Sequence, residues 1–517
     1  MIVSQLKFFK RVWEKFCSQK LSQLPSLSSS PIFYLVFFSL LFLPFLIYFP
    51  SLHYDFVWDD HSFLVSNKSI LEDTPWAAHF VDRTTQAESP EAQIYRPIRN
   101  LSYCLEHKLL GLTPFWFHFN NILLHGLNGV LLFLLARFCF QISLSRAWIL
   151  SLFFLVHPMQ TEVVCWVKSR DDLLAVFFGA LAFLSYHFYL KTPKLRILLP
   201  FILLYLLSLF SKESSLFLFA VFFLWAMHQK PSLPLKKKIY LFLFLALPVL
   251  AYSFFRFYAL EQWGQDSFYL AGSFLKTQLG MTLIYRDYLF KILFPWDQRV
   301  NYMGYNPFSM ESETTLILYG FLLLILIALL FFRASKKGRI RLSFFIFSFI
   351  PIANLIPMMQ WEAERFLYFP LFFFALFLGD LIPTFKKDAV KKGALILAIL
   401  YFVFLLMQTT QREKIWKNNR MLGLSMLSSN PYSYHGLVLV FEYNRQHDLH
   451  RETVQLAEET LKLFPNELLI YEYLSFAYLQ LGTYDLAQQT VQKGLSCFPK
   501  APLLLRFKAF LNTQGLT

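Results

Sequence analysis

The chain has 517 residues, of which 56% are hydrophobic, 19% are aromatic and only 16% are charged. A soluble globular domain is about half apolar and about a quarter charged, so this balance and a mean hydropathy of +0.45 indicate a polytopic membrane protein. The net charge of +15 argues against nucleic-acid binding, because the cations fall in short segments between apolar runs, as cytoplasmic loops do.

The apolar runs cross a membrane consistently when the basic loops are placed inside. A hydrocarbon core of about 30 Å needs roughly 20 apolar residues per helix, and fewer where neighbouring helices shield it. We therefore expect a basic cytoplasmic N-terminus at 1–30 and an all-α membrane helix bundle at 31–410. About eleven spans are predicted: 32–50, 118–136, 147–158, 172–190, 197–210, 215–228, 239–257, 315–332, 342–357, 366–383 and 394–409. The charged segment 275–295 does not fit this order and is predicted to be interfacial or re-entrant on the outer face.

The remaining part, 411–517, is polar, and the topology places it outside the cytoplasm. Three prolines recur in it at a spacing of 34 residues: Pro431, Pro465 and Pro499. A period of 34 is typical of tetratricopeptide repeats (TPR), so repeats are expected at about 431–464 and 465–498, with a capping helix at 500–514. A short α-solenoid of this kind fits a structural cap on the outer face as well as a peptide-binding module.

Charged residues gather on the outer side of this topology, in turns of only a few residues. Ionisable side chains at membrane depth are costly, so each cluster needs an account. Asp59 and Asp60 follow the first span and, taken alone, would fit an interfacial acidic turn. The other members lie in later outer segments: Arg96, Glu162, Lys168, Arg170, Asp171, Asp172, Lys212, Glu213, Arg286, Glu362, Glu364 and Arg365. Together these positions predict a functional site at the outer membrane surface.

A polar stripe lies on the predicted span 118–136. His118, Asn121, His125 and Asn128 are spaced by 3, 4 and 3 residues and therefore share one helical face. Hydrogen bonds between helices account for such a stripe better than a metal site does, because Asn is a poor partner for a His pair.

An outer pocket of carboxylates and cations suits a lipid-linked phosphate substrate. Arg or Lys would hold the phosphate, and a carboxylate would take the proton of an attacking hydroxyl. Of Asp59 and Asp60, one can act as the base while the other orients the acceptor or a metal. Repulsion between two close carboxylates raises the pKa of one of them.

Eight short motifs follow one another along nearly the whole chain. They are Phe56-Val57-Trp58-Asp59-Asp60, Tyr95-Arg96-Pro97, Phe117 to His125, His157 to Glu162, Ser169 to Leu174, Ser211-Lys212-Glu213, Asn354 to Pro357, and Ala363 to Pro370. Each motif alone is weak, but in this order they resemble the transmembrane-and-TPR O-mannosyltransferase-like proteins. This resemblance implies a GT-C glycosyltransferase fold and inverting transfer of a sugar, typically mannose, from a polyprenyl- or dolichyl-phosphate donor.

The resemblance also implies roles for individual residues. The family's catalytic acidic pair falls on Asp59 and Asp60, with Asp59 as the expected base. The implied substrate-binding residues are Glu162 and Asp172 as supporting acids, Arg170, Lys212 and Arg365 at the donor phosphate, and Arg96 and Glu213 beside them. An optional divalent cation, Mg or Mn, would be held by Asp59, Asp60 and Glu162.

The acceptor implied by the resemblance is a hydroxyl of an extracytoplasmic protein or glycan, which the TPR domain would help to bind. The alternative function is a non-catalytic membrane anchor that presents the TPR module to partners. The outer charge clusters argue against an anchor, which needs none of them. The expected setting is a bacterial inner membrane with a periplasmic C-terminus, or the endoplasmic reticulum membrane if the chain is eukaryotic.

Overall fold

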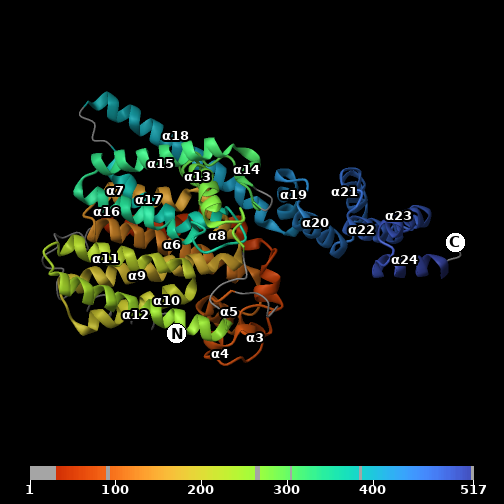
Figure 1. The fold of residues 1–517 in the computed structure, drawn as a ribbon, viewed down its shortest axis with the longest axis horizontal. Coiled ribbons are helices and arrows are strands. Elements are labelled where there is room, and N and C mark those ends of the chain that lie inside the picture. The colour runs from red at the N-terminus through yellow and green to blue at the C-terminus, as the bar shows by residue number, and fades with distance from the viewer. Residues whose placement is uncertain (1–30, 89–93, 262–267, 303–305, 383–386, 514–517) are drawn as a thin grey trace.

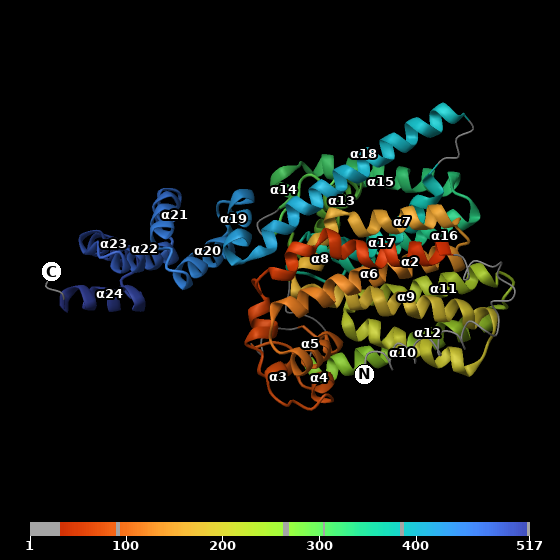
Figure 2. The same cartoon turned by 180° about the vertical axis from the view of Figure 1, so that it is seen from behind.

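The computed structural model describes residues 31–88, 94–261, 268–302, 306–382 and 387–513. Within these ranges every regular element is helical, which confirms the predicted all-α class. The helices of the first 410 residues form a bundle, from one end of which the C-terminal helices extend (Figures 1 and 2). The predicted cytoplasmic segment 1–30 lies outside the described residues.

Each segment predicted to cross the membrane falls on a helix. These helices are α2 (Pro31–Ile47), α6 (Pro114–Phe138), α7 (Leu144–Val156), α9 (Arg170–Lys191), α10 (Leu195–Ser211), α11 (Leu218–Gln229), α12 (Leu235–Leu260), α15 (Glu313–Arg333), α16 (Lys336–Phe347), α17 (Tyr368–Leu381) and α18 (Asp388–Glu413). Five of the described helices are long and apolar enough to span a bilayer, or six if α7 and α8 (Thr161–Cys165), which meet at a bend of 54°, form one broken span. The chain is a multi-pass membrane protein, and the number of eleven spans stays a prediction.

One predicted span differs clearly from the structure. Helix α16 ends at Phe347, although the apolar run continues to residue 357. Pro351 and Pro357 lie in that run, and a proline removes a backbone donor and disfavours helix in the residue before it. The helix also begins earlier than predicted, at charged Lys336, whereas the predicted span begins at residue 342.

The outer loop after α2 contains a helix that the apolar runs did not predict. Helix α5 (Pro97–Leu110) begins with a proline at its first position and ends before Gly111, whose positive φ of 74° is one that glycine adopts readily. The short helices α3 (Lys68–Leu71) and α4 (Ala78–Val81) pack beside it. Figure 2 shows the three together at the end of the bundle where α6 begins.

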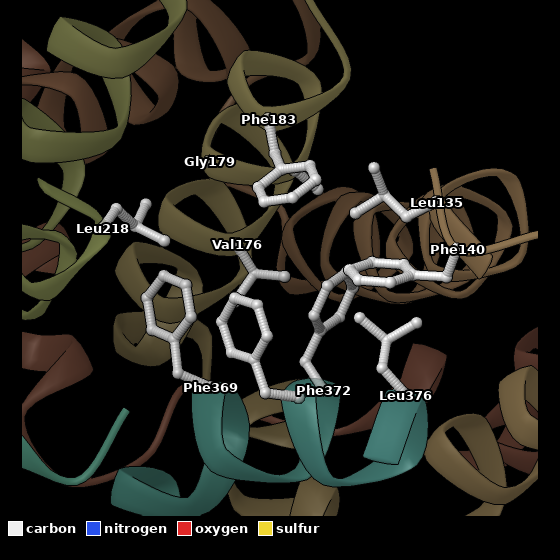
Figure 3. Close-up of a pocket in the computed structure, with 11 residues that line it drawn as sticks. Leu135, Phe140, Val176, Gly179, Phe183, Leu218, Phe369, Phe372 and Leu376 are labelled. Carbon is white, nitrogen blue, oxygen red and sulfur yellow. The ribbon is translucent and has the colours of Figure 1, made fainter. Parts of the chain in front are cut away.

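The centre of the bundle is packed closely, mostly by aromatic and small residues. Figure 3 shows an apolar pocket among α6, α9, α11 and α17 that is lined only by hydrocarbon and phenyl side chains and Gly179. The polar stripe of α6 makes the predicted hydrogen bonds between helices. His125 contacts the Tyr368 hydroxyl at 3.0 Å, and the Asn128 amide donates to the Leu173 carbonyl at 3.0 Å.

The C-terminal helices have a hydrophobic core of their own, which includes Phe441, Leu474 and Val491. The helices that form this core are α20 (Tyr434–Gln446), α21 (His450–Leu463), α22 (Leu468–Gln480), α23 (Tyr484–Cys497) and α24 (Pro502–Thr513). Before them, α19 (Asn419–Ser429) places its buried Leu422 and Met426 in the core of the bundle. The pair α20 and α21 lies within the predicted repeat 431–464, and α22 and α23 lie within 465–498. Their assignment to the TPR class stays a prediction.

Helices α2 and α6 lie so close together at Gly126 that one added methyl group should lower the stability of the bundle. A Cβ at Gly126 would meet the Leu41 carbonyl oxygen at 2.7 Å, so Gly126→Ala should destabilise the bundle by about 1–3 kcal/mol through overpacking. Gly393→Ala in α18 is the control, since nothing lies within 4 Å of its Cβ position. Thermal unfolding in detergent checks this: a lower melting temperature is expected for Gly126→Ala only, and equal melting temperatures would contradict it.

Candidate functional site

The predicted catalytic pair lies in a tight turn at the end of the bundle that the predicted topology places outside the cytoplasm. Trp58, just before the pair, has a φ of 53°, a left-handed conformation that costs a residue other than glycine roughly 1–2 kcal/mol. The Asp60 side chain is fully buried. Its Oδ2 accepts the Val57 N–H at 3.0 Å and its Oδ1 accepts the Lys168 N–H at 2.7 Å. Asp60 therefore joins the first outer loop to the turn before α9.

Burial also changes the proton affinity of Asp60. Loss of water around the carboxyl raises its pKa to about 7, although the two backbone N–H donors oppose this rise. A carboxyl with both oxygens engaged by the backbone has little capacity to contact an acceptor. The geometry therefore gives Asp60 a positioning role.

Asp59 points to a more open environment. Its side chain is 33% exposed, and its Oδ2 lies 2.9 Å from Lys168 Nζ. The same ammonium lies 4.6 Å from the centre of the Trp166 ring, within the range of a cation–π contact. Of the two acids, Asp59 is the one that a hydroxyl can reach.

A stack of three tryptophans connects this turn to the C-terminal part of the chain. Trp58 stacks on Trp166 with ring centres 5.0 Å apart, and Trp166 stacks on Trp416 at 5.6 Å. The Trp58 N–H donates to Asn419 Oδ1 at 2.8 Å. The beginning of α19 thus helps to hold the residue that precedes the Asp pair. No sequence pattern predicts this contact.

Two arginines lie near the Asp59–Lys168 pair and remain partly exposed. Arg365 donates to both oxygens of buried Glu162, from Nη1 at 2.7 Å and from its backbone N–H at 3.0 Å. Arg96 forms a bidentate pair with Glu213 and contacts Asp171 at 2.5 Å. Both guanidinium groups interact electrostatically with the Lys168 ammonium. Arg96, Lys168 and Arg365, the outer cation cluster, are 12%, 12% and 16% exposed.

Two of the cations predicted at the donor phosphate are instead neutralised inside the protein. Arg170 is buried and donates to Glu106 at 2.5 Å, to Asn121 at 2.8 Å and to the Phe117 carbonyl at 2.9 Å. Lys212 pairs with Asp172 and with Asp171. This geometry does not favour phosphate contact by Arg170 or Lys212. Through these contacts, both side chains stabilise the start of α9.

The predicted metal ligands are not arranged to hold a cation. Asp60 accepts backbone N–H groups with both oxygens, and both oxygens of Glu162 bind Arg365, which leaves only Asp59. Over the ranges that the structure describes, no three His, Cys, Asp or Glu side chains form a metal-binding group. Mg or Mn therefore does not fit these residues.

A second cluster of ion pairs stabilises the turn that carries Arg365. The sequence predicted its acids but not their partners. Glu364 accepts from Arg412 Nη2 with both carboxylate oxygens at 3.0 Å, and Glu362 pairs with Lys291. Burial raises the pKa of Glu362 to about 7, against the effect of Lys291. These contacts tie α18 and α13 (Phe274–Leu293) to the turn that carries Arg365.

The buried Arg170–Glu106 pair yields a stability prediction. Glu106→Gln leaves the Arg170 guanidinium buried without its counter-charge, which typically costs 3–5 kcal/mol. Asp73→Asn breaks the exposed Lys108–Asp73 pair of the same helix α5 and should leave stability unchanged. Chemical unfolding of both variants checks this. A Glu106→Gln variant as stable as the parent would show that the Arg170–Glu106 pair does not stabilise the fold.

Several known proteins are similar to the chain in sequence. No family model matches the chain. It is 38% identical to protein O-mannosyl-transferase TMTC1 of Mus musculus over 141 residues, which are 26% of this chain and 15% of the relative. It is 33% identical to TMTC2 of Mus musculus over 146 residues, 27% of this chain and 17% of the relative.

A longer match extends over most of the bundle. Protein O-mannosyl-transferase F38B6.6 of Caenorhabditis elegans is 26% identical over 425 residues, 78% of this chain and 59% of the relative. The chain therefore covers less than two thirds of each of these relatives. The predicted resemblance is confirmed: the chain is related in sequence to the protein O-mannosyl-transferases.

Proposed function

We propose that this chain is a membrane glycosyltransferase of the GT-C type. It transfers a sugar, mannose or another hexose, from a polyprenyl-phosphate donor to a hydroxyl of an extracytoplasmic protein or glycan. The observation that carries the proposal is the reachable Asp59 carboxylate beside the outer cation cluster. The names of the relatives support mannose as the sugar and a protein as the acceptor.

Asp59 is the general base of the proposed reaction. Its carboxylate takes the proton of the acceptor hydroxyl as that oxygen attacks the anomeric carbon. The bond between the anomeric carbon and the phosphate oxygen breaks, and its electrons leave with the polyprenyl phosphate. Attack opposite the leaving group inverts the anomeric centre.

The outer cation cluster has the chemistry to stabilise the leaving phosphate. Arg96 and Arg365 are paired with carboxylates in the structure, so a phosphate would have to share their guanidinium groups with these partners, and the Lys168 ammonium adds charge. Lys168 also pairs with Asp59, so an arriving phosphate would compete with the carboxylate for this ammonium. The donor thereby frees Asp59 to accept a proton. No step passes through a metal ion.

The proposed topology places this site on the non-cytoplasmic membrane surface. Eleven spans put the N-terminus inside and residues 411–517 outside, in a periplasm or in the lumen of the endoplasmic reticulum. The two helix pairs α20–α21 and α22–α23 support a TPR solenoid. Contact of Asn419 with Trp58 supports a role of this domain in acceptor delivery, because it reaches the turn that bears Asp59.

Substitution of the Asp pair tests the assigned base. Asp59→Asn should lower sugar transfer by about 10²–10⁴-fold, the usual contribution of a general base, while leaving donor binding intact. Asp388→Asn, an exposed change at the far end of the bundle, should transfer at the parental rate. Transfer of labelled sugar to a peptide by the full chain in nanodiscs is the measurement. If Asp59→Asn transferred sugar at the parental rate, the assignment of Asp59 as the general base would be wrong.

The raised pKa of Asp60 predicts opposite trends for stability and transfer. Its folded pKa of about 7 exceeds the ordinary value of about 3.9, so proton uptake favours the folded state. This contribution is complete below about pH 4 and is lost as the pH rises through about 7. Only the ionised carboxylate accepts well from both Val57 and Lys168, so transfer should fall as the pH is lowered from about 8 to about 6.

Asp60→Asn should flatten both trends, which unfolding and transfer assays at several pH values measure. Asp388→Asn again serves as the control and should keep the parental pH dependence. An unchanged pH profile in Asp60→Asn would show that another group titrates in this window.

A further inference from the structure

A polar pocket of about 250 Å³ lies at the end of the bundle opposite Asp59. The ends of three helices and the start of a fourth meet there: α6, α9, α11 and α16. Its lining consists of Phe138, Cys139, Phe140, Gln141, His187, Lys191, Trp225, His228, Gln229, Lys337 and Ile340. The topology places this end on the cytoplasmic side.

The charge around this cytoplasmic pocket has one sign. Lys191 and Lys337 line it and are exposed, and none of the described lining residues is acidic. The neighbours that act electrostatically on His228 are Lys336, Lys337 and Arg341, and the neighbour of His187 is Lys191. Arg341 is neutralised by Asp380, which leaves the lysines as the net charge. The pocket therefore attracts an anion.

A buried donor on the pocket wall lacks a partner among the described residues. Trp225 is 1% exposed, and its indole Nε1 makes no hydrogen bond to any residue that the structure describes. Leaving a buried donor unsatisfied typically costs about 1–3 kcal/mol, so such a group calls for an explanation. The Trp225 ring packs against His187 and His228, with ring centres 5.5 Å apart in each case. An oxygen-rich anion would satisfy the indole if it entered between these rings, which now cover the N–H.

The turn after α6 also presents a polar group to this pocket. Gln141 has a φ of 57°, which is unfavourable for a residue other than glycine, and its amide oxygen accepts from Lys337 Nζ at 2.8 Å. Phe140 lines both this pocket and the apolar pocket of Figure 3. The polar pocket thus ends against the bundle core, which leaves the cytoplasmic surface as the way in.

We propose that the cytoplasmic pocket binds the phosphate of an anionic phospholipid headgroup. Lys191 and Lys337 supply the charge, and the Trp225 indole supplies a fixed donor. The pocket lies at the level of the inner leaflet, where anionic headgroups concentrate and attract lysines. The bound headgroup joins the ends of α9, α11 and α16 and so stabilises the bundle. This site is independent of the proposed sugar transfer.

The test compares thermal unfolding of the full chain in nanodiscs of phosphatidylcholine with and without phosphatidylglycerol. We expect phosphatidylglycerol to raise the parental melting temperature by several degrees. The double variant Lys191→Gln with Lys337→Gln should lose most of this shift, and Trp225→Phe, which removes the indole N–H together with part of the ring, should lose part of it.

The matched control is Lys230→Gln with Lys237→Gln, which removes the same charge at the same end but outside the lining. It should keep the shift; equal loss in the control would show diffuse surface attraction and overturn the site. Inorganic phosphate added to phosphatidylcholine nanodiscs separates the two sources of phosphate. An equal rise in melting temperature with free phosphate would overturn the assignment to a lipid. No shift in the parent would overturn the proposal altogether.

Discussion

The buried carboxyl of Asp60 holds together two loops whose contacting residues lie 108 positions apart in the chain. Its two oxygens accept backbone N–H groups from Val57 and Lys168, and this contact also places the Asp59 and Lys168 side chains opposite each other. A buried carboxyl without such donors would be costly, so the two loops stabilise each other. The tryptophan stack and the Arg365–Glu162 pair lie beside this contact between the two loops.

The charged residues at the outer end divide into two groups by exposure. Arg170 with Glu106 and Arg412 with Glu364 are buried and mutually neutralised, so each fixes the position of a helix end. The outer cation cluster and Asp59 stay partly exposed. Breaking a buried pair is strongly destabilising, whereas a partly exposed charge can exchange its partner for a substrate. The buried ion pairs therefore fix the helix ends that carry the partly exposed charges.

Composition was enough to predict the helical bundle, because long apolar runs have few other structures available in a membrane. Helix α5 was missed because its sequence is amphipathic and short. The sequence also places the acidic pair and the arginines on one side of the membrane. It does not show that Arg170 meets Glu106, or that Asn419 meets Trp58 from 361 positions away. Those partners depend on how loops fold over the bundle end, which no periodic pattern records.

Asn419 accepts a hydrogen bond from the Trp58 backbone, and Trp416 stacks on Trp166, which stacks on Trp58. These contacts connect the start of the C-terminal helices to the turn that bears Asp59. A partner that displaces α19 would break the hydrogen bond between Asn419 and Trp58, a residue whose backbone is already in the left-handed conformation. Under the proposed function, partner binding at the distal helices and substrate binding at the Asp59 site would be coupled equilibria. By thermodynamic reciprocity, whatever tightens one through this contact tightens the other by the same factor.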